Sequence, residues 1–333
     1  MFKFAFIAHP IDLKQIRELV PLKFLPDFIL RKSLRFVKPF VASTVKNVVS
    51  ISGKQVEGYV IVCPLLPKQI LDFNQEFVLS RIIEACRLGE KLGAKIVGLG
   101  GYTSVIGDKG TTIAKNVNIA VTTGNSYTAA SILELLFQIA KEKNLDLTKS
   151  RAAIIGATGS IGNACARYLA EYVQDIVITA RHTDKLEELK QNIENISKAK
   201  VEINLDARGA VKEADIVIVT TSAPDALLDV ADLKAGAIAC DVSVPKNISG
   251  RNSNRKDVIV FDGGLIKTPS NVKVTINTGL PEGVLYGCIS ETIILALEEG
   301  FENFSLGNNL SLDKITEISE MAKKHGFHPV KIS

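Results

Sequence analysis

The sequence predicts an α/β protein with two lobes, and two observations support this. Strand-like and helix-like segments alternate along the 333 residues, as in parallel sheets covered by helices. A glycine-rich turn, GATGSIG, then opens a second block of the same alternation. We therefore expect an N-terminal α/β lobe over 1–127, a doubly wound parallel-sheet domain over 128–280, and C-terminal helices over 281–333 that pack back on the first lobe.

Apolar runs and helical spacing locate the elements of the first lobe. Strands are expected at Phe2–Ala8, Glu57–Cys63 and Lys95–Leu99, and helices at Phe77–Gly93 and Ser126–Asn144.

The second block and the end of the chain follow the same logic. Helices are expected at Ile161–Tyr172, Lys185–Ile196, Gly283–Gly300 and Leu312–His325. Strands are expected at Arg151–Ile155, Ile176–Thr179, Val201–Leu205, Asp215–Thr220, Ala237–Asp241, Val258–Phe261 and Val272–Ile276.

The overall charge is mild, with a formal net charge of +4. A nucleic-acid-binding protein usually has a concentrated basic footprint, so no nucleic-acid partner is expected. The charge is uneven, however, because the apolar segment Arg17–Lys46 holds seven basic and two acidic residues, a net +5. This segment is either an ordinary solvated face or a docking surface for an acidic partner or an anionic membrane surface.

The five cysteines are widely scattered, at Cys63, Cys86, Cys165, Cys240 and Cys288. Their spacing predicts neither a disulfide framework nor a metal site. The apolar run at the N-terminus, MFKFAFIAHP, is too short for a signal peptide, and no apolar run approaches the ~18 residues of a membrane span. We expect a cytoplasmic protein whose thiols stay reduced.

The glycine turn has the spacing of a dinucleotide-binding loop, with Gly156, Gly159 and Gly162 between a strand and a helix. Glycines permit the tight turn and the close approach of backbone to a pyrophosphate, which the N–H groups of the helix start attract. The alternative is a structural glycine turn. The expected cofactor contacts are Gly156, Ala157, Thr158, Gly159, Ser160, Ile161 and Gly162.

The end of the next strand indicates which dinucleotide binds. An NAD site usually offers Asp or Glu there for the ribose 2′-hydroxyl, but this chain has Thr179-Ala180-Arg181. A guanidinium suits a 2′-phosphate, so NADP(H) is favoured over the alternative of an ordinary surface arginine. Later strand ends are rich in small residues that leave room for a nicotinamide ring, or else form plain turns: Thr220, Ser222, Gly263 and Gly264.

Two loops of the first lobe resemble anion or oxyanion cradles, with glycines, hydroxyls and an amide around helix starts. Ordinary loop and capping chemistry explains them equally well. His9 follows a strand and faces a possible cleft, although a structural histidine is the commoner case. The candidate substrate-binding residues are His9, Gly101, Tyr102, Thr103, Ser104, Asn125 and Tyr127.

Cys288 differs from the other four cysteines, which lie in apolar strands or helices where a small hydrophobe is expected. It lies early in its own helix, where the positive end of the helix dipole is expected to lower the pKa of a thiol. It is therefore either a nucleophile or a buried apolar residue.

Several motifs occur together: LGGYTS, TTGNSYTA, GATGSIGNA, ITAR, DGG, GCISETIILALEEGFENFSLG and HGFHP. In this order they resemble the long-chain acyl-[acyl-carrier-protein] reductases best known from cyanobacteria. The resemblance implies that NADPH reduces an acyl thioester to a fatty aldehyde, with Cys288 as acyl acceptor. It also implies acyl carrier protein or acyl-CoA as the acyl donor, with an aldehyde-consuming enzyme or a membrane surface as further partners.

The chain departs from the family's pattern on the substrate side. The segment between Ser104 and Thr122 is shorter, Ser126-Tyr127 replaces a Thr-His pair, and the residues before Cys288 differ. Two other functions stay open. One is a dehydrogenase of the shikimate-dehydrogenase type that acts on a small hydroxy acid, and the other is a non-catalytic NADP(H)-binding protein.

Overall fold

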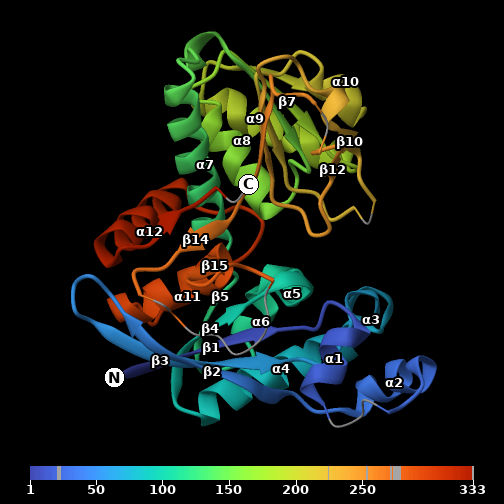
Figure 1. Cartoon of the computed structure of the whole chain (residues 1–333), viewed down its shortest axis with the longest axis vertical. Helices are drawn as coiled ribbons and strands as arrows, with labels where there is room; N and C mark the ends of the chain where they lie inside the picture. The colour runs from blue at the N-terminus through green and yellow to red at the C-terminus, as the bar shows by residue number, and fades with distance from the viewer. Residues whose placement is uncertain (21–23, 224, 253, 271, 273–278, 332–333) are drawn as a thin grey trace. The chain divides into compact units, whose positions relative to one another are not determined.

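The structure, a computed structural model, describes residues 1–333 except 21–23, 224, 253, 271, 273–278 and 332–333. The chain divides into two compact units (Figure 1). Unit 1 comprises Met1–Gly124, Lys267–Gly307 and Glu320–His328, and unit 2 comprises Asn125–Ile266, Asn308–Ser319 and Pro329–Ser333.

Unit 1 is built on a five-stranded sheet in the order β2-β3-β1-β4-β5. Strand β2 pairs antiparallel with β3, and the remaining pairs are parallel. The strands are β1 (Phe2–Ala8), β2 (Phe40–Val49), β3 (Gln55–Val62), β4 (Ala94–Leu99) and β5 (Ala120–Thr122).

Helices α4 (Gln75–Lys91) and α11 (Gly287–Glu298) cover opposite faces of this sheet. A Cβ on Gly89 of α4 would lie 2.7 Å from Ala5 Cβ, and one on Gly98 of β4 would lie 1.9 Å from Thr292 Oγ1 and 2.8 Å from the Phe6 ring. Neighbouring residues of a strand point to opposite faces. Glycine at position 98 therefore allows α11 to approach the sheet closely.

Short helices surround this sheet: α1 (Leu13–Leu19), α2 (Asp27–Ser33), α3 (Pro67–Asp72), α5 (Ile106–Lys109) and α6 (Thr111–Ala114). Single turns of 3-10 helix also occur in unit 1, at η1 (Leu34–Phe36) and η2 (Gly101–Ser104).

Unit 2 contains a fully parallel six-stranded sheet in the order β13-β11-β9-β6-β7-β8. In chain order this is 3-2-1-4-5-6 from the β8 edge, the order of a Rossmann dinucleotide-binding domain. Buried apolar runs such as Ile216–Val219 suit strands covered on both faces. The strands are β6 (Arg151–Ile155), β7 (Asp175–Thr179), β8 (Lys200–Ile203), β9 (Ile216–Val219), β11 (Ile238–Asp241) and β13 (Ile259–Asp262).

The helices of unit 2 and the remaining short elements complete the chain. The helices are α7 (Asn125–Glu142), α8 (Ser160–Leu169), α9 (Thr183–Ile196) and α10 (Ala207–Val211), with turns η3 (Leu147–Lys149) and η4 (Val230–Asp232). Strand β10 (Leu228–Asp229) pairs with β12 (Ile248–Ser249). Three further strands form a sheet in the order β15-β14-β16: β14 (Leu265–Lys267), β15 (Val284–Tyr286) and β16 (His328–Pro329). The last helix is α12 (Leu312–His325).

The predicted fold class is confirmed, since the sequence-based strands and helices recur with shifted ends. One prediction is wrong in part, because the expected helix Gly283–Gly300 opens as strand β15 and becomes helical only at Gly287. The expected strand Val272–Ile276 lies, apart from Val272, outside the described residues. No helix within the described ranges is both long and apolar enough to span a membrane.

A buried histidine links three segments of unit 1. The ring of His325 is fully buried, with Nδ1 2.7 Å from Ser50 Oγ and Nε2 2.7 Å from Glu298 Oε1. Burial lowers the pKa of His325, and this outweighs the opposing effect of Glu298. Desolvation acts to raise the pKa of Glu298, but the hydrogen bonds and electrostatic interactions with Lys324 and His325 together outweigh it and lower that pKa.

These pKa shifts predict a loss of stability in mild acid. Both folded pKa values are depressed, so each group stabilises the fold at neutral pH. The His325 contribution should begin to fall below about pH 6.5 and that of Glu298 below about pH 4.5. Urea unfolding between neutral pH and about pH 5 should show a shallower decline in His325→Gln than in the native protein. His328→Gln, at an exposed site, should keep the native slope, and equal slopes in both variants would contradict the assignment.

Candidate functional site

The candidate residues of unit 1 gather at the carboxyl edge of its sheet. Strands β1, β4 and β5 are parallel neighbours in the order β1-β4-β5, so their carboxyl ends meet at one edge. His9 follows β1, Gly100–Ser104 follows β4, and Thr123–Gly124 follows β5. Ligand sites of open α/β sheets lie at this edge.

His9 and the loop after β4 are held together. The backbone N–H of Tyr102 donates to His9 Nε2 at 3.0 Å, and His9 Nδ1 lies 3.1 Å from the carbonyl oxygen of Pro10. Burial lowers the pKa of His9, so the ring is neutral and carries its proton on Nδ1. Gly101 has φ +55°, and a Cβ there would lie 2.6 Å from His9 Nε2. Both ring nitrogens are thus engaged in shaping the loop.

The other hydroxyl candidates of unit 1 also have backbone partners. Thr103 is fully buried and its Oγ1 donates to the carbonyl of Gly100 at 2.8 Å. Ser104 Oγ donates to the carbonyl of Gly101 at 2.7 Å. Both hydroxyls therefore stabilise the single turn of η2 by hydrogen bonds to its backbone.

Asn125 and Tyr127 open α7 in unit 2. Tyr127 is fully buried, and burial raises the pKa of its phenol. A phenol in that state keeps its proton at neutral pH.

The loop after β5 lies directly against the start of α11. Gly124 has φ +74°, and a Cβ on it would lie 2.1 Å from Cys288 Cα and 2.5 Å from Cys288 Cβ. Cys288 is the second residue of α11, in its first turn. The TTGN segment and the cysteine, far apart in the sequence, are therefore in backbone contact.

A buried carboxylate joins the same two segments. Glu291 is fully buried in α11, and its Oε1 accepts a short hydrogen bond from Thr122 Oγ1. Thr122 Oγ1 in turn accepts the N–H of Gly124 at 3.2 Å. Glu291 was not among the candidate residues predicted from the sequence. A single acidic residue within the apolar run ISETIILAL, three residues after Cys288, is the signal that could have identified it.

The segment after α11 completes this corner of unit 1. The N–H of Phe304 donates to the carbonyl of Val121 at 3.0 Å, and Asn303 Oδ1 accepts the N–H of Val121 at 2.9 Å. Thr123 Oγ1 donates to the carbonyl of Ser305. The TTGN, GCISE and FENFS segments therefore meet in one place.

Cys288 is the cysteine of the five that keeps partial exposure, because the other four are buried. The residue reaches the surface, but its sulfur is closely surrounded, and this burial raises the pKa of the Cys288 thiol to about 12. The backbone N–H groups of Cys288 and Ile289 lower the pKa, and the charge of Glu291 raises it. The expectation of a lowered pKa is therefore wrong, since burial outweighs the helix start.

The glycine loop of unit 2 has the shape a dinucleotide needs. Gly156, directly after β6, has φ +87°, and a Cβ on it would lie 3.0 Å from the backbone of Thr220 and Thr221. A Cβ on Gly162 would lie 2.5 Å from the carbonyl oxygen of Gly156. Glycine is thus required for the turn and for the close packing of α8 on it, and the loop fits a dinucleotide-binding loop.

The strand order of unit 2 reverses between β6 and β9, and the glycine loop follows β6 at that switch point. Thr220, which follows β9, donates through Oγ1 to the carbonyls of Ile155 and Gly156 at 3.2 Å and 3.3 Å. Ser222 is exposed beyond it. The loop and the end of β9 are therefore joined by hydrogen bonds.

The end of β7 holds the residues expected near the ribose. Thr179 Oγ1 donates to the carbonyl of Asn204 at 2.7 Å, which ties the ends of β7 and β8 together. The carbonyl of Thr179 accepts the N–H groups of Gly156 and Ala157. Arg181 is exposed two residues after β7, with no ion pair to any residue that the structure describes.

Gly263 and Gly264 follow β13 and are buried. A Cβ on Gly263 would lie 2.5 Å from Cys240 Sγ and 3.0 Å from Ile132 Cγ1. Close packing is therefore sufficient reason for glycine at position 263.

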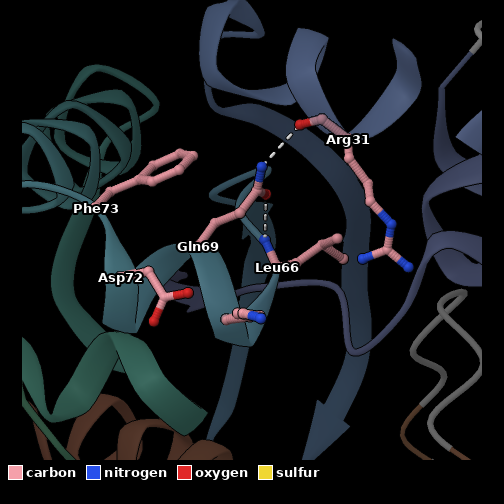
Figure 2. Close-up of a pocket in the computed structure, with 6 residues that line it drawn as sticks. Arg31, Leu66, Gln69, Asp72 and Phe73 are labelled. Atoms are coloured by element: carbon pink, nitrogen blue, oxygen red, sulfur yellow. Dashed lines mark hydrogen bonds between the residues drawn. The ribbon is translucent and has the colours of Figure 1, made fainter. Parts of the chain in front are cut away.

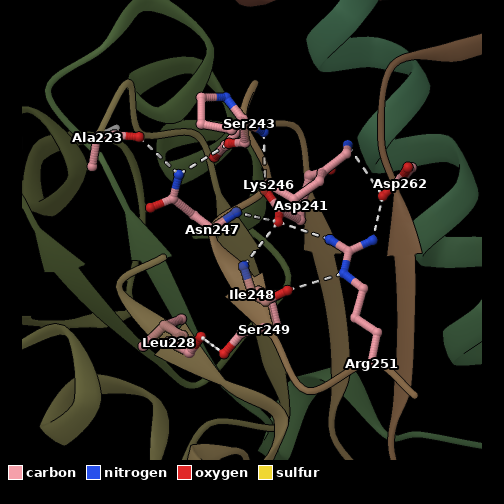
Figure 3. Close-up of polar contacts among 11 residues, drawn as sticks. Ala223, Leu228, Asp241, Ser243, Lys246, Asn247, Ile248, Ser249, Arg251 and Asp262 are labelled. Carbon is pink, nitrogen blue, oxygen red and sulfur yellow. Dashed lines mark hydrogen bonds and ion pairs between the residues drawn. The ribbon is translucent and has the colours of Figure 1, made fainter. Parts of the chain in front are cut away.

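A polar network after β11 escaped the sequence argument (Figure 3). Asp241 is fully buried, and its carboxylate accepts the N–H groups of Ser243, Asn247 and Ile248 at 2.8–3.0 Å and the Arg251 guanidinium at 2.8 Å. The loop that it organises buries Ser243 Oγ and Asn247 Oδ1, which lack a hydrogen-bond partner among the described residues.

Comparison with known proteins agrees with this geometry. A family model described as shikimate / quinate 5-dehydrogenase matches residues 138–263. The long-chain acyl-[acyl-carrier-protein] reductase of Synechococcus elongatus is 28% identical over 99% of both chains. The resemblance to this family of reductases is confirmed. The chain is therefore an NAD(P)-dependent oxidoreductase with a Rossmann unit.

Two further similarities are more limited. The aminotransferase PigE of Serratia sp. is 31% identical over 98% of this chain, which spans 39% of the length of that relative. Among solved structures, L-tryptophan dehydrogenase from Nostoc punctiforme covers 97% of this chain and 80% of its own at 12% identity, with a TM-score of 0.43.

The contact between Gly124 and Cys288 can be tested by adding one methyl group. Gly124→Ala combines a left-handed backbone with a clash at Cys288 Cα, so we expect a loss of roughly 2 kcal/mol or more. This corresponds to a Tm lower by about 4–8 °C. Gly300→Ala is the matched control, because its Cβ would meet nothing closer than 3.7 Å and its φ is ordinary. Equal Tm values for the two variants in thermal unfolding would rule out the close contact.

Proposed function

We propose that the chain reduces a fatty acyl thioester to an aldehyde, with Cys288 as the acyl acceptor and NADPH as the reductant. The observation that supports this most is the position of Cys288. It is the partly exposed cysteine, it lies in the first turn of α11, and it contacts Gly124 at the carboxyl edge of the sheet. Full-length similarity to an acyl-[acyl-carrier-protein] reductase adds to it.

A thiol suits this reaction because it both attacks a thioester and leaves a tetrahedral adduct readily. In the first step Cys288 Sγ bonds to the acyl carbon, and the bond from that carbon to the donor's sulfur breaks. NADPH, when bound, would be the source of the hydride that reduces this acyl carbon. The bond from carbon to Sγ then breaks, the aldehyde leaves, and Cys288 regains a proton from solvent.

The raised pKa of Cys288 means that its proton must be removed as the sulfur attacks. We assign this task to Glu291, a carboxylate three residues further along the same helix face, whose charge acts on the thiol. Glu291 would pass the proton to the departing thiolate of the donor. Thr122, which donates to Glu291, would hold the carboxylate in place.

The residues that would hold NADPH come from unit 2. The N–H groups at the start of α8 would meet the pyrophosphate, and Gly156 and Gly162 give it access. Arg181 would pair with the 2′-phosphate, since it is exposed and directly follows the strand end that usually selects the ribose. Acyl carrier protein or acyl-CoA would supply the acyl group.

Acyl transfer can be observed without the reductant. Incubation with acyl-carrier protein or acyl-CoA, with NADPH omitted, should add one acyl group to the peptide that contains Cys288, as measured by mass spectrometry. Cys288→Ala should abolish the adduct, and Cys86→Ala, at a buried site, should retain it. An acyl group on any other residue, or none, would refute the covalent mechanism.

Glu291→Gln refines the same experiment. The amide still offers Thr122 an acceptor but cannot take a proton, so acylation should slow about 100-fold. The pKa of the Cys288 thiol should fall at the same time, because a charge that raises it is lost. A slower reaction with an unchanged thiol pKa would assign Glu291 a structural role alone.

A second function is kept because the shikimate / quinate 5-dehydrogenase family model matches residues 138–263. The chain would then oxidise or reduce a small hydroxy acid with no covalent step. The match supports the nucleotide-binding part and does not extend to Cys288. Turnover of a hydroxy acid by Cys288→Ala at the native rate would favour this function.

The cofactor preference depends on Arg181. Arg181→Ser should raise the Kd for NADPH about tenfold, since a hydrogen bond between charged groups contributes about 1.5–3 kcal/mol. The Kd for NADH should change little. Lys212→Ser removes another exposed cation of unit 2 and should leave both values unchanged. Fluorescence titration gives the Kd values, and equal loss of NADH binding would contradict the role of Arg181.

A further inference from the structure

Helix α2 of unit 1 presents apolar side chains to solvent. Leu30 anchors its inner side and is fully buried, as is Leu34 of η1. Both belong to a small apolar cluster that also contains Ile16 and Leu66. On its outer side, Phe28 is 64% exposed and Lys32 follows one turn later. Residues four apart share a helix face, so an aromatic ring and a cation point away from the core together.

The neighbouring turns repeat this arrangement. Phe24 is 86% exposed before α2 and Phe36 is 78% exposed after it. Among the described residues, these are the two most exposed of the large apolar side chains, and with Phe28 they lie within thirteen consecutive positions. Scattered single apolar residues on a surface are ordinary, but a cluster of this kind marks an interaction site.

The cluster is positively charged. Arg31, Lys32, Arg35 and Lys38 lie in the same stretch, and the guanidinium of Arg35 lies 5.3 Å from the Phe36 ring centre. Within the described part of the chain no carboxylate forms an ion pair with these four residues. Asp27, the acidic residue of α2, is paired with Arg17 at 2.6 Å. The cations are therefore available to an external anion.

A shallow pocket continues this surface between α2 and α3 (Figure 2). It has a volume of about 220 Å³ and is lined by Arg31, Leu66, Lys68, Gln69, Asp72 and Phe73. Gln69 Nε2 donates to the carbonyl of Arg31 at 2.7 Å, and its Oε1 accepts the N–H of Leu66 at 3.0 Å. Gln69 thereby ties α2 to α3. Its lining combines the apolar side chains of Leu66 and Phe73 with two cations, Arg31 and Lys68, and one carboxylate, Asp72.

We propose that the basic aromatic surface (Phe24, Phe28, Ile29, Arg31, Lys32, Arg35, Phe36 and Lys38) docks the protein on an anionic lipid bilayer. The phenylalanine rings would enter the boundary between headgroups and acyl chains, and the cations would meet anionic headgroups.

The chemistry of the surface favours a bilayer over an acidic protein. A protein interface buries a continuous apolar core within a polar rim. Here three exposed phenylalanines and four cations are mixed within positions 24–38, a composition typical of segments that bind at the surface of an anionic membrane. The proposal does not depend on the reaction at Cys288, and each can fail without the other.

Sedimentation with lipid vesicles tests the proposal. The protein should bind vesicles of phosphatidylcholine mixed with phosphatidylglycerol at least about tenfold more tightly than vesicles of phosphatidylcholine alone. Added salt should weaken the binding, because it screens the cations. Equal binding to both kinds of vesicle, or to neither, would overturn the proposal.

Two double variants locate the site. Phe28→Ser with Phe36→Ser, and Lys32→Glu with Arg35→Glu, should each weaken binding to anionic vesicles by about tenfold or more. The matched control replaces exposed groups of unit 2, Leu205→Ser with Lys212→Glu, and should bind as the native protein does. Circular dichroism verifies that each variant is folded.

An acidic protein is the competing occupant, and the same variants distinguish it. If Lys32→Glu with Arg35→Glu raises KM for a carrier-bound acyl substrate and leaves vesicle binding unchanged, the lipid proposal is wrong. If vesicle binding falls and KM for a short soluble acyl thioester stays constant, the lipid proposal holds.

Discussion

The close contact between Gly124 and Cys288 is the constraint on which the candidate site depends. A loop that ends one strand and the first turn of a helix approach until no side chain fits between them. Thr122 and Glu291 reinforce the contact with a buried hydrogen bond. A carboxylate that is buried away from water needs a hydrogen-bond partner of this kind. Gly124 allows the loop and the helix to approach closely, and the hydrogen bond between Thr122 and Glu291 joins them at the same place.

A second glycine has a comparable role further along the same helix. Gly98 in β4 leaves the space that Thr292 of α11 occupies. Helix α11 therefore packs closely against two glycines, Gly98 in β4 and Gly124 directly after β5. Cys288 is held at the carboxyl edge of the sheet by backbone contacts, which are less adaptable than contacts between flexible side chains.

In unit 2 the order of the strands decides where the cofactor loop lies. The order reverses between β6 and β9, and the glycine loop lies at that reversal. Gly162 allows α8 to pack on the loop, and the carbonyl of Thr179 receives two N–H groups from it. Two buried polar atoms beyond β11, on Ser243 and Asn247, add polar groups without a partner among the described residues.

Much of this was determined by the sequence alone, because it depends on local pattern. Apolar runs, helical spacing and the glycine spacing of Gly156–Gly162 identified the Rossmann unit and its loop, and a position early in its helix set Cys288 apart from the other four cysteines. Only the tertiary structure decided the rest. The raised thiol pKa, the buried Glu291 and the strand before α11 arise from segments far apart in the chain. Burial and packing depend on which segments meet, and no local pattern specifies that.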